Sequence, residues 1–170
     1  MDYLPCDIGN LKNLGALCLE GNRISNIPDA IGKLEKLVSL RLTYNKVNAL
    51  PKKIGELKHL EYLFLGNNKL SLLPKEIGEL TKLQSLFLND NNLKDLPKEI
   101  GKLKNLRYFR LNNTDIPNVV HNCGLVKQSI VSVKHDCGTI YIYTGNERFT
   151  IEEAKKWILK TTMVRKQTFF

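Results

Sequence analysis

Four residues of the types that bind zinc lie close together in the C-terminal third of the chain. They form two His-x-Cys pairs, His121 with Cys123 and His135 with Cys137. Imidazole nitrogen and thiolate sulfur are the usual ligands of structural zinc, but zinc sites usually pair two cysteines or two histidines at short spacing. Cys123 also matches an apolar position of the repeat described below, where a free thiol acts as a small hydrophobe. A metal site is therefore a minor alternative, and a Cys123–Cys137 disulfide is another if the protein is secreted.

The chain contains no recognisable catalytic or nucleotide-binding motif. Gly-x-Ser-x-Gly, the P-loop sequence and Gly-x-Gly-x-x-Gly are all missing, and these are the patterns that place a nucleophile or cradle a phosphate. A catalytic role for Cys18 would need a nearby base, and none of the three histidines is expected in the same layer of the repeat. We therefore expect a protein that is not an enzyme and that requires no cofactor.

A pattern of leucine and asparagine recurs with a period of 23 residues. The leucines that open successive units are Leu14, Leu37, Leu60, Leu83 and Leu106. The asparagines that follow the short predicted strands are Asn22, Asn45, Asn68 and Asn91. One such unit cannot bury its own apolar side, so consecutive units must stack and share a core. We expect the asparagines to be buried and to bond turn backbone, because a side-chain amide supplies both donors and an acceptor.

Each unit continues with the motif Leu/Ile-Pro-x-x-Ile-Gly-x-Leu. Over about residues 4–117 the chain resembles the typical 23-residue class of intracellular leucine-rich repeats. It is similar to the Ras-suppressor family, the Ras–Raf scaffold family and the plant intracellular Ras-group proteins. The resemblance implies an α/β fold: a right-handed solenoid of five to six coils, with a parallel β-sheet on its concave face. We assign residues 1–117 to this solenoid.

Residues 118–170 depart from the repeat and are expected to form a degenerate last repeat and a cap. We predict a sixth strand at 130–133, a strand at 138–143, a turn at 144–146 and a helix at 151–163. The apolar side of that helix would close the last coil, as terminal repeats require. The basic tail 164–170 is expected to be mobile. Helix and tail could alternatively bind a membrane surface or a partner.

The first unit begins within the motif, at Leu4. Leu4, Ile8 and Leu11 are therefore expected at an open end of the core unless Tyr3 or a partner covers them. This predicts either a monomer or a dimer formed through the uncapped N-terminal end.

Strand residues that alternate with the core leucines should face solvent on the concave side. Phe64 and Phe87 stand there as neighbours, at positions where the fold needs no apolar residue. Aromatic and arginine clusters are typical of interface centres, although the two rings could also just stack on each other along the sheet. The predicted partner-binding residues are Arg41, Tyr44, Tyr62, Phe64, Asn67, Phe87, Asn89, Asp90, Tyr108, Arg110 and Asn112.

The formal net charge is +9, but the basic residues are spread along the chain and interleaved with acidic ones. Nucleic-acid binding needs a clustered basic surface and usually a recognisable module, so it is disfavoured. The chain has no apolar run long enough to span a membrane and no signal-peptide pattern at its start. Four cysteines without such a signal are typical of a reducing compartment, so we expect a cytoplasmic protein.

These observations predict a protein–protein interaction module that binds its partner through the concave aromatic and arginine residues. Because the families it resembles bind Ras-type GTPases or their complexes, the resemblance makes a Ras-superfamily small GTPase the first candidate partner. The alternative is a pathogen or viral effector that docks on a host protein through the same residues.

Overall fold

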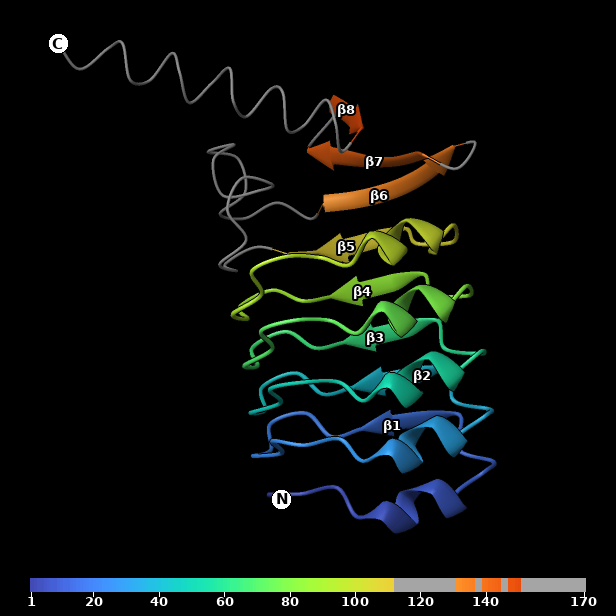
Figure 1. The fold of residues 1–170 in the computed structure, drawn as a ribbon, viewed down its shortest axis with the longest axis vertical. Coiled ribbons are helices and arrows are strands. Elements are labelled where there is room, and N and C mark those ends of the chain that lie inside the picture. Colours follow the sequence, from blue (N-terminus) through green and yellow to red (C-terminus); the bar gives the residue numbers. More distant parts are fainter. Residues whose placement is uncertain (112–130, 137–138, 145–146, 151–170) are drawn as a thin grey trace, which may run out of the picture.

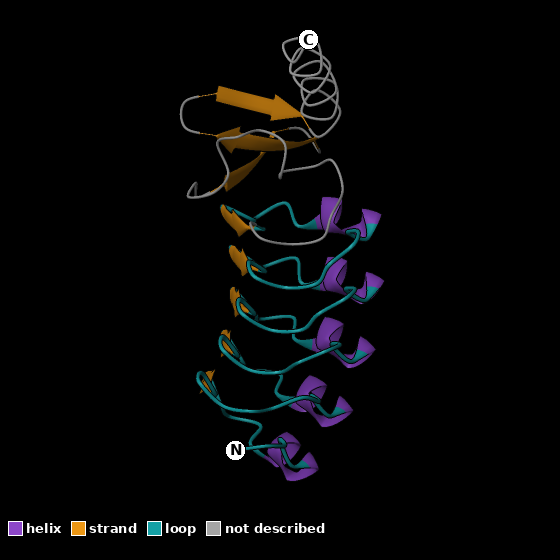
Figure 2. Ribbon diagram, turned by 90° about the vertical axis from the view of Figure 1, so that its left-hand side faces the viewer, coloured by secondary structure: helices purple, strands orange, loops and turns teal. Residues whose placement is uncertain are grey.

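The computed structural model describes residues 1–111, 131–136, 139–144 and 147–150. Within residues 1–111, coils of similar shape are stacked along the long axis (Figure 1). The strands form one side of the stack and short 3-10 helices form the other (Figure 2). The parallel strands are β1 (Ala16–Cys18), β2 (Ser39–Arg41), β3 (Tyr62–Phe64), β4 (Ser85–Phe87) and β5 (Tyr108–Arg110). The helices are η1 (Cys6–Asn10), η2 (Asp29–Lys33), η3 (Lys52–Glu56), η4 (Lys75–Glu79) and η5 (Lys98–Lys102).

Strand register follows the sequence period without a slip. Leu17 is opposite Leu40, Leu40 opposite Leu63, Leu63 opposite Leu86 and Leu86 opposite Phe109. A shift by one residue would move these side chains from the core to solvent, so burial fixes the register. The predicted leucine-rich repeat solenoid is thus confirmed for the coils of β1 to β5.

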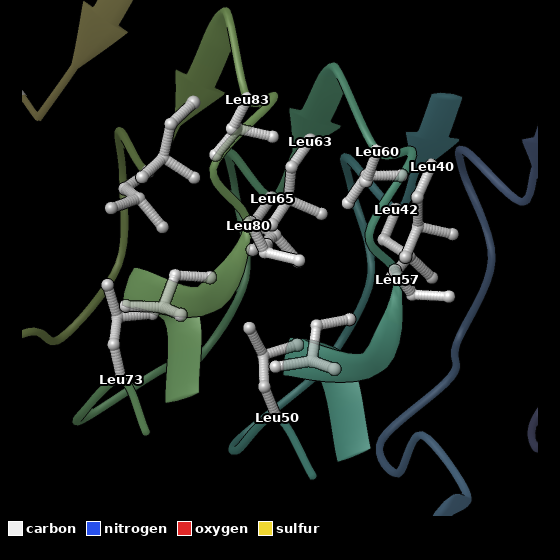
Figure 3. Packing of buried hydrophobic residues seen from close by; sticks show 14 of the residues in the cluster. Leu40, Leu42, Leu50, Leu57, Leu60, Leu63, Leu65, Leu73, Leu80 and Leu83 are labelled. Atoms are coloured by element: carbon white, nitrogen blue, oxygen red, sulfur yellow. The ribbon is translucent and has the colours of Figure 1, made fainter. Parts of the chain in front are cut away.

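Leucine and isoleucine side chains fill the space between the strands and the helices. Figure 3 shows leucines of successive coils, among them Leu40, Leu63 and Leu83, projecting into the space between the strands and the helices. These three side chains are fully buried. The buried leucines and isoleucines from Leu4 to Leu111 belong to one cluster, so the core is continuous along the stack.

Three of the four asparagines after the strands, Asn45, Asn68 and Asn91, form the predicted buried ladder. Asn22 of the first coil is only half-buried, and its Oδ1 accepts a hydrogen bond from the Met1 amino group (2.9 Å). Asn68 donates hydrogen bonds to the carbonyl oxygens of Leu42 (2.9 Å) and Leu65 (3.1 Å), and its Oδ1 accepts one from the Val47 amide (2.9 Å). Asn45 and Asn91 make equivalent bonds in their coils. Each buried asparagine therefore satisfies turn backbone of its own coil and of the preceding coil.

Proline and glycine have separate roles on the helix side. Pro51 directly precedes η3 with φ −67°, and prolines stand at the same place before the other four helices. Gly55 lies where a neighbouring coil approaches, because a Cβ added there would be 2.7 Å from the carbonyl oxygen of Glu76. The recurrent Ile-Gly pair thus permits close stacking of the helices.

The sheet changes direction after β5. Strands β6 (Val131–Asp136), β7 (Thr139–Thr144) and β8 (Glu147–Thr150) continue it, and each pairs antiparallel with the strand before it. The sixth strand predicted at 130–133 is present as part of β6, but β6 runs antiparallel to β5 and so is not a further coil of the repeat. The strand predicted at 138–143 is present as β7, and β8 was not predicted. Four further predictions fall on residues that the structure does not describe. They are the domain boundary at 117/118, residues 145 and 146 of the turn, the helix at 151–163 and the tail 164–170.

At the first coil, the expected open end is smaller than predicted. Leu4 is buried, whereas Ile8 is half-buried and the Leu11 side chain is 51% exposed. Tyr3 is 71% exposed and does not cover them. Instead, the carbonyl oxygen of Met1 accepts a hydrogen bond from the Arg23 amide (2.9 Å), which holds the segment before Leu4 along the first coil.

In the parts of the chain that the structure describes, no helix is long and apolar enough to cross a membrane.

Candidate interaction surface

The side chains of β1 to β5 that point away from the core, with those of the turn that follows each strand, form a surface that we call the sheet face. Equivalent residues lie side by side across the strands, as predicted. The first column is Ala16, Ser39, Tyr62, Ser85 and Tyr108; the second is Cys18, Arg41, Phe64, Phe87 and Arg110. Two further columns come from the turns that follow the strands in sequence. The third is Glu20, Thr43, Gly66 and Asn89, and the fourth is Gly21, Tyr44, Asn67 and Asp90.

Four residues of the second column form a continuous row across β2 to β5. The rings of Phe64 and Phe87 meet edge to face, with centroids 4.9 Å apart and an interplanar angle of 83°. The Arg41 guanidinium lies over the Phe64 ring at 5.1 Å, and the Arg110 guanidinium lies over the Phe87 ring at 4.8 Å. Both contacts bring a cation to the electron-rich face of a ring. We call Arg41, Phe64, Phe87 and Arg110 the stacked row.

Phe64 and Phe87 can be interpreted either as an interface centre or as two rings that only stack on each other, and the stacked row is compatible with both. The rings do pack on each other, yet both remain half-exposed, as does Arg110, while Arg41 is exposed. The ring contacts hold the four side chains in one arrangement before any partner arrives. A surface ordered in advance loses less side-chain entropy on binding.

Tyr44, three residues after Arg41, adds an exposed aromatic ring in the turn that follows β2, on strained backbone. Its φ is +57°, and the equivalent residues Gly21, Asn67 and Asp90 have φ of +70°, +56° and +55°. Glycine, asparagine and aspartate tolerate this left-handed conformation, whereas a bulky aromatic residue seldom adopts it. The Tyr44 side chain is 59% exposed, so packing on the core does not offset the strain.

A shallow hollow of about 550 Å³ lies at the β1 end of the sheet face. Its lining consists of Gly15, Ala16, Cys18, Val38, Ser39, Arg41 and Tyr62. Sequence reasoning selected Arg41 and Tyr62 but missed the hollow. The signal was available, because the first column has small residues at β1 and β2 and a tyrosine at β3.

The remaining predicted residues differ in their surroundings. Tyr108 is 51% exposed at the end of the first column. Asn89 donates a hydrogen bond to the Asp90 carboxylate (2.6 Å) and lies directly over Gly66. Asn67 is half-buried in its left-handed turn. Asn112 lies outside the described residues.

Three of the four candidate metal ligands, His121, Cys123 and Cys137, also lie outside the described residues. His135 falls within β6, paired with Ile140. Among the residues that the structure describes, no three potential ligands gather at one point. Cys6 and Cys18 are free thiols and both are exposed.

The helix side carries a mixed charge, as the sequence pattern indicates. Lys53 forms an ion pair with Glu56 (2.6 Å), and this hydrogen bond raises the pKa of Lys53. Glu79 lies between Lys58 (3.4 Å) and Lys102 (3.8 Å). All five side chains are more than half exposed, so these pairs contribute little to stability.

Comparison with known proteins agrees with this geometry. Residues 45–137 match the family model described as a leucine-rich repeat region. The chain belongs to the leucine-rich repeat family. No curated protein sequence gives a significant match.

Solved leucine-rich repeat structures are similar over about two thirds of the chain. A leucine-rich repeat protein of Leptospira interrogans is 47% identical, with a TM-score of 0.67, over 68% of this chain and 30% of its own. An internalin of Listeria monocytogenes is 26% identical, with a TM-score of 0.58, over 67% of this chain and 33% of its own. The structure of PEPR1–AtPEP1 is 35% identical, with a TM-score of 0.60, over 66% of this chain and 16% of that one. The chain thus spans a third or less of each of these proteins.

Proposed function

We propose that this leucine-rich repeat domain binds a protein partner through the sheet face, with the stacked row and Tyr44 at the centre of the contact. The supporting observation is that exposed aromatic and arginine side chains adjoin one another at positions where the repeat needs neither. Large apolar surface groups that the fold does not require mark interaction sites more often than chance. Membership of the leucine-rich repeat family supports protein binding in general.

The finer proposal is that the first partner to test is a Ras-superfamily small GTPase in the cytosol. Its support is the resemblance of the repeat motif to GTPase-associated families, and the exposed free thiols of Cys6 and Cys18 suit a reducing compartment. The alternative partner is a host protein bound by an effector. It is favoured by the bacterial sources, Leptospira interrogans and Listeria monocytogenes, of two similar structures.

The coarser proposal can be tested without knowing the partner. A random peptide library displayed on phage is selected on the wild-type domain, and each selected peptide is then titrated against the Phe64→Ala/Phe87→Ala variant. We expect each phenylalanine to account for about 2 kcal/mol or more of binding free energy. Because the two rings also contact each other and the arginines, the double variant should lose about 1 kcal/mol of folding stability. Thermal unfolding measured in parallel separates this loss from the loss of binding.

Leu72→Ala is the matched control, because Leu72 is 57% exposed and lies outside the sheet face. Ligands that bind the double variant as tightly as the wild type would show that the sheet face is not the binding surface. Independently, ligand binding should slow maleimide labelling of Cys18 in the hollow while leaving Cys6 unaffected.

The GTPase proposal needs a separate measurement. Calorimetric titration with a Ras-type GTPase loaded with GDP, or with a non-hydrolysable GTP analogue, should show tighter binding of the GTP form. Equal affinity for both forms, or no binding, would remove the GTPase from consideration. The sheet-face proposal would stand.

A further inference from the structure

The two guanidinium groups of the stacked row combine a fixed position with unused hydrogen-bonding capacity. Within residues 1–111 the ion pairs are made by lysines, and neither Arg41 nor Arg110 has a carboxylate partner. Each guanidinium instead lies over a phenylalanine ring. A guanidinium carries five N–H donors along its edge, and a contact with a ring does not consume them, so they remain available to an acceptor. The acceptor that best fits this edge is a carboxylate, which accepts two parallel hydrogen bonds.

Among the described residues, no ion pair joins either arginine to a carboxylate of the sheet face, Glu20 included, or to Glu61. Asp90 accepts a hydrogen bond from Asn89 (2.6 Å). Glu61, which precedes β3, accepts one from Gln84 (2.8 Å). Since none of the described carboxylates pairs with the arginines, we assign the acidic groups that would meet them to the partner, and an acidic partner also suits the net charge of +9.

The sheet sets the distance between the Cα atoms of the two arginines. Arg41 pairs with Phe64, Phe64 with Phe87 and Phe87 with Arg110, so the arginines are three strand intervals apart. At about 4.8 Å per interval, this separation is roughly 14 Å. The two phenylalanine rings lie midway and present an apolar surface between the charges.

An extended segment of a partner matches this spacing. In extended chain, alternate side chains face the same way, and residues four apart are about 13 Å from each other. A helix fits less well, because residues that share one of its faces recur at about 10 Å or 16 Å. An acidic, an apolar and a second acidic residue at alternate positions would meet Arg41, the phenylalanine pair and Arg110 in turn.

We propose that the stacked row recognises an extended acidic segment of a protein partner, of the form acidic-x-apolar-x-acidic, lying across strands β2 to β5. The acidic side chains bind Arg41 and Arg110, and the apolar side chain packs on Phe64 and Phe87. This inference rests on the proposed function of the sheet face, and it specifies the chemistry that this face selects.

The test uses the full chain and synthetic peptides with blocked ends. The core peptide is Glu-Ser-Leu-Ser-Glu with glycine flanks, so its glutamates are about four positions apart, as the Arg41–Arg110 spacing requires. The control peptides have the same composition, but their glutamates are about two, three or six positions apart. We expect the core peptide to bind about tenfold more tightly than each control, as loss of one charge-assisted contact implies. Controls of identical charge exclude general attraction to a basic protein. Equal binding by all peptides, or no binding by any, would overturn the inference.

Variants of the arginines identify the contacts. Arg41→Met and Arg110→Met should each weaken the core peptide by about tenfold. Arg107→Met is the matched control, because Arg107 is an exposed arginine in the same coil as Arg110 but outside the stacked row. Arg41→Lys and Arg110→Lys keep the charge but lose the planar fork, so they should recover only part of the affinity. The Arg41→Glu/Arg110→Glu variant should prefer the peptide in which both glutamates are replaced by lysine.

The outcomes separate the two proposals. If library-selected ligands depend on Phe64 and Phe87 while the core peptide binds no better than its spacing controls, the sheet face is an interface and the acidic-segment inference is wrong. If no selected ligand depends on the phenylalanines, the proposed function itself fails. A helical peptide with glutamates seven positions apart that binds more tightly than the core peptide would also contradict an extended partner.

Discussion

At the scale of single residues, the side chains that hold the solenoid are distinct from those available for binding. Asn68 is buried and its hydrogen bonds connect two coils. Tyr44 is exposed and has left-handed backbone, like the equivalent Asn67 of the next coil. Asn68 and Tyr44 should therefore respond to substitution in opposite directions.

Tyr44→Asn should stabilise the domain. Asparagine occupies the equivalent left-handed position at Asn67, so the substitution should raise the free energy of unfolding by about 1 kcal/mol. The same variant should bind sheet-face ligands more weakly, because it removes an exposed ring. Urea unfolding and ligand titration of one preparation check both signs, and Asn67→Tyr should show the opposite change in stability. Lower stability of Tyr44→Asn would mean that the tyrosine has a structural role.

Asn68→Ala should destabilise the domain by about 3 kcal/mol or more, because buried carbonyl and amide groups of two coils lose their partners. Asn92→Ala provides the comparison, since Asn92 is exposed one position after the ladder residue Asn91. Denaturant unfolding of both variants measures the difference. Similar midpoints would contradict the ladder as a source of stability.

At the scale of elements, the helices stack closely because one residue in each lacks a side chain. A Cβ at Gly55 would lie 2.7 Å from the Glu76 carbonyl oxygen, while a Cβ at Gly15 meets no atom within 4 Å. The same substitution thus meets a crowded site at one position and open space at the other.

Gly55→Ala should lower the free energy of unfolding by about 1–3 kcal/mol, because η3 and η4 must move apart. Gly15→Ala should be neutral or slightly stabilising, since alanine reduces the entropy of the unfolded chain. Thermal unfolding of the two variants beside the wild type gives the comparison. A loss at Gly15 as large as that at Gly55 would show that close stacking is not the cause.

At the scale of the whole molecule, stability comes from the shared leucine core and not from charge pairs. The three ion pairs of residues 1–111 are exposed, and the net charge of +9 favours expansion of the chain by self-repulsion.

Raising the concentration of sodium chloride to about 0.5 M should therefore leave the melting temperature unchanged or raise it, because screening relieves the repulsion. Calorimetry at low and high salt measures this effect, with the binding of the acidic core peptide as an internal contrast that should weaken. A marked fall in melting temperature with salt would show that the ion pairs matter more than their exposure indicates.

Much of this architecture could be predicted from the sequence, because a strict period fixes which side of every strand is buried. The columns that contain Phe64 and Arg41 follow directly from it. The position of each guanidinium over a ring could not be predicted, since long side chains choose rotamers by local contacts. The antiparallel direction of β6 was also missed, because alternation of side chains is the same for either strand direction. The strain at Tyr44 was readable in principle, as Gly21, Asn67 and Asp90 all tolerate left-handed backbone.

The exact register of the coils has a consequence for engineering. Because residue positions repeat across β2, β3 and β4 without a slip, a duplicated copy of residues 60–82 should enter the stack as one more coil. The arginines would then lie about 5 Å further apart. The solenoid would act as a molecular ruler, and its preferred peptide should lengthen by two residues, from a glutamate spacing of four to a spacing of six.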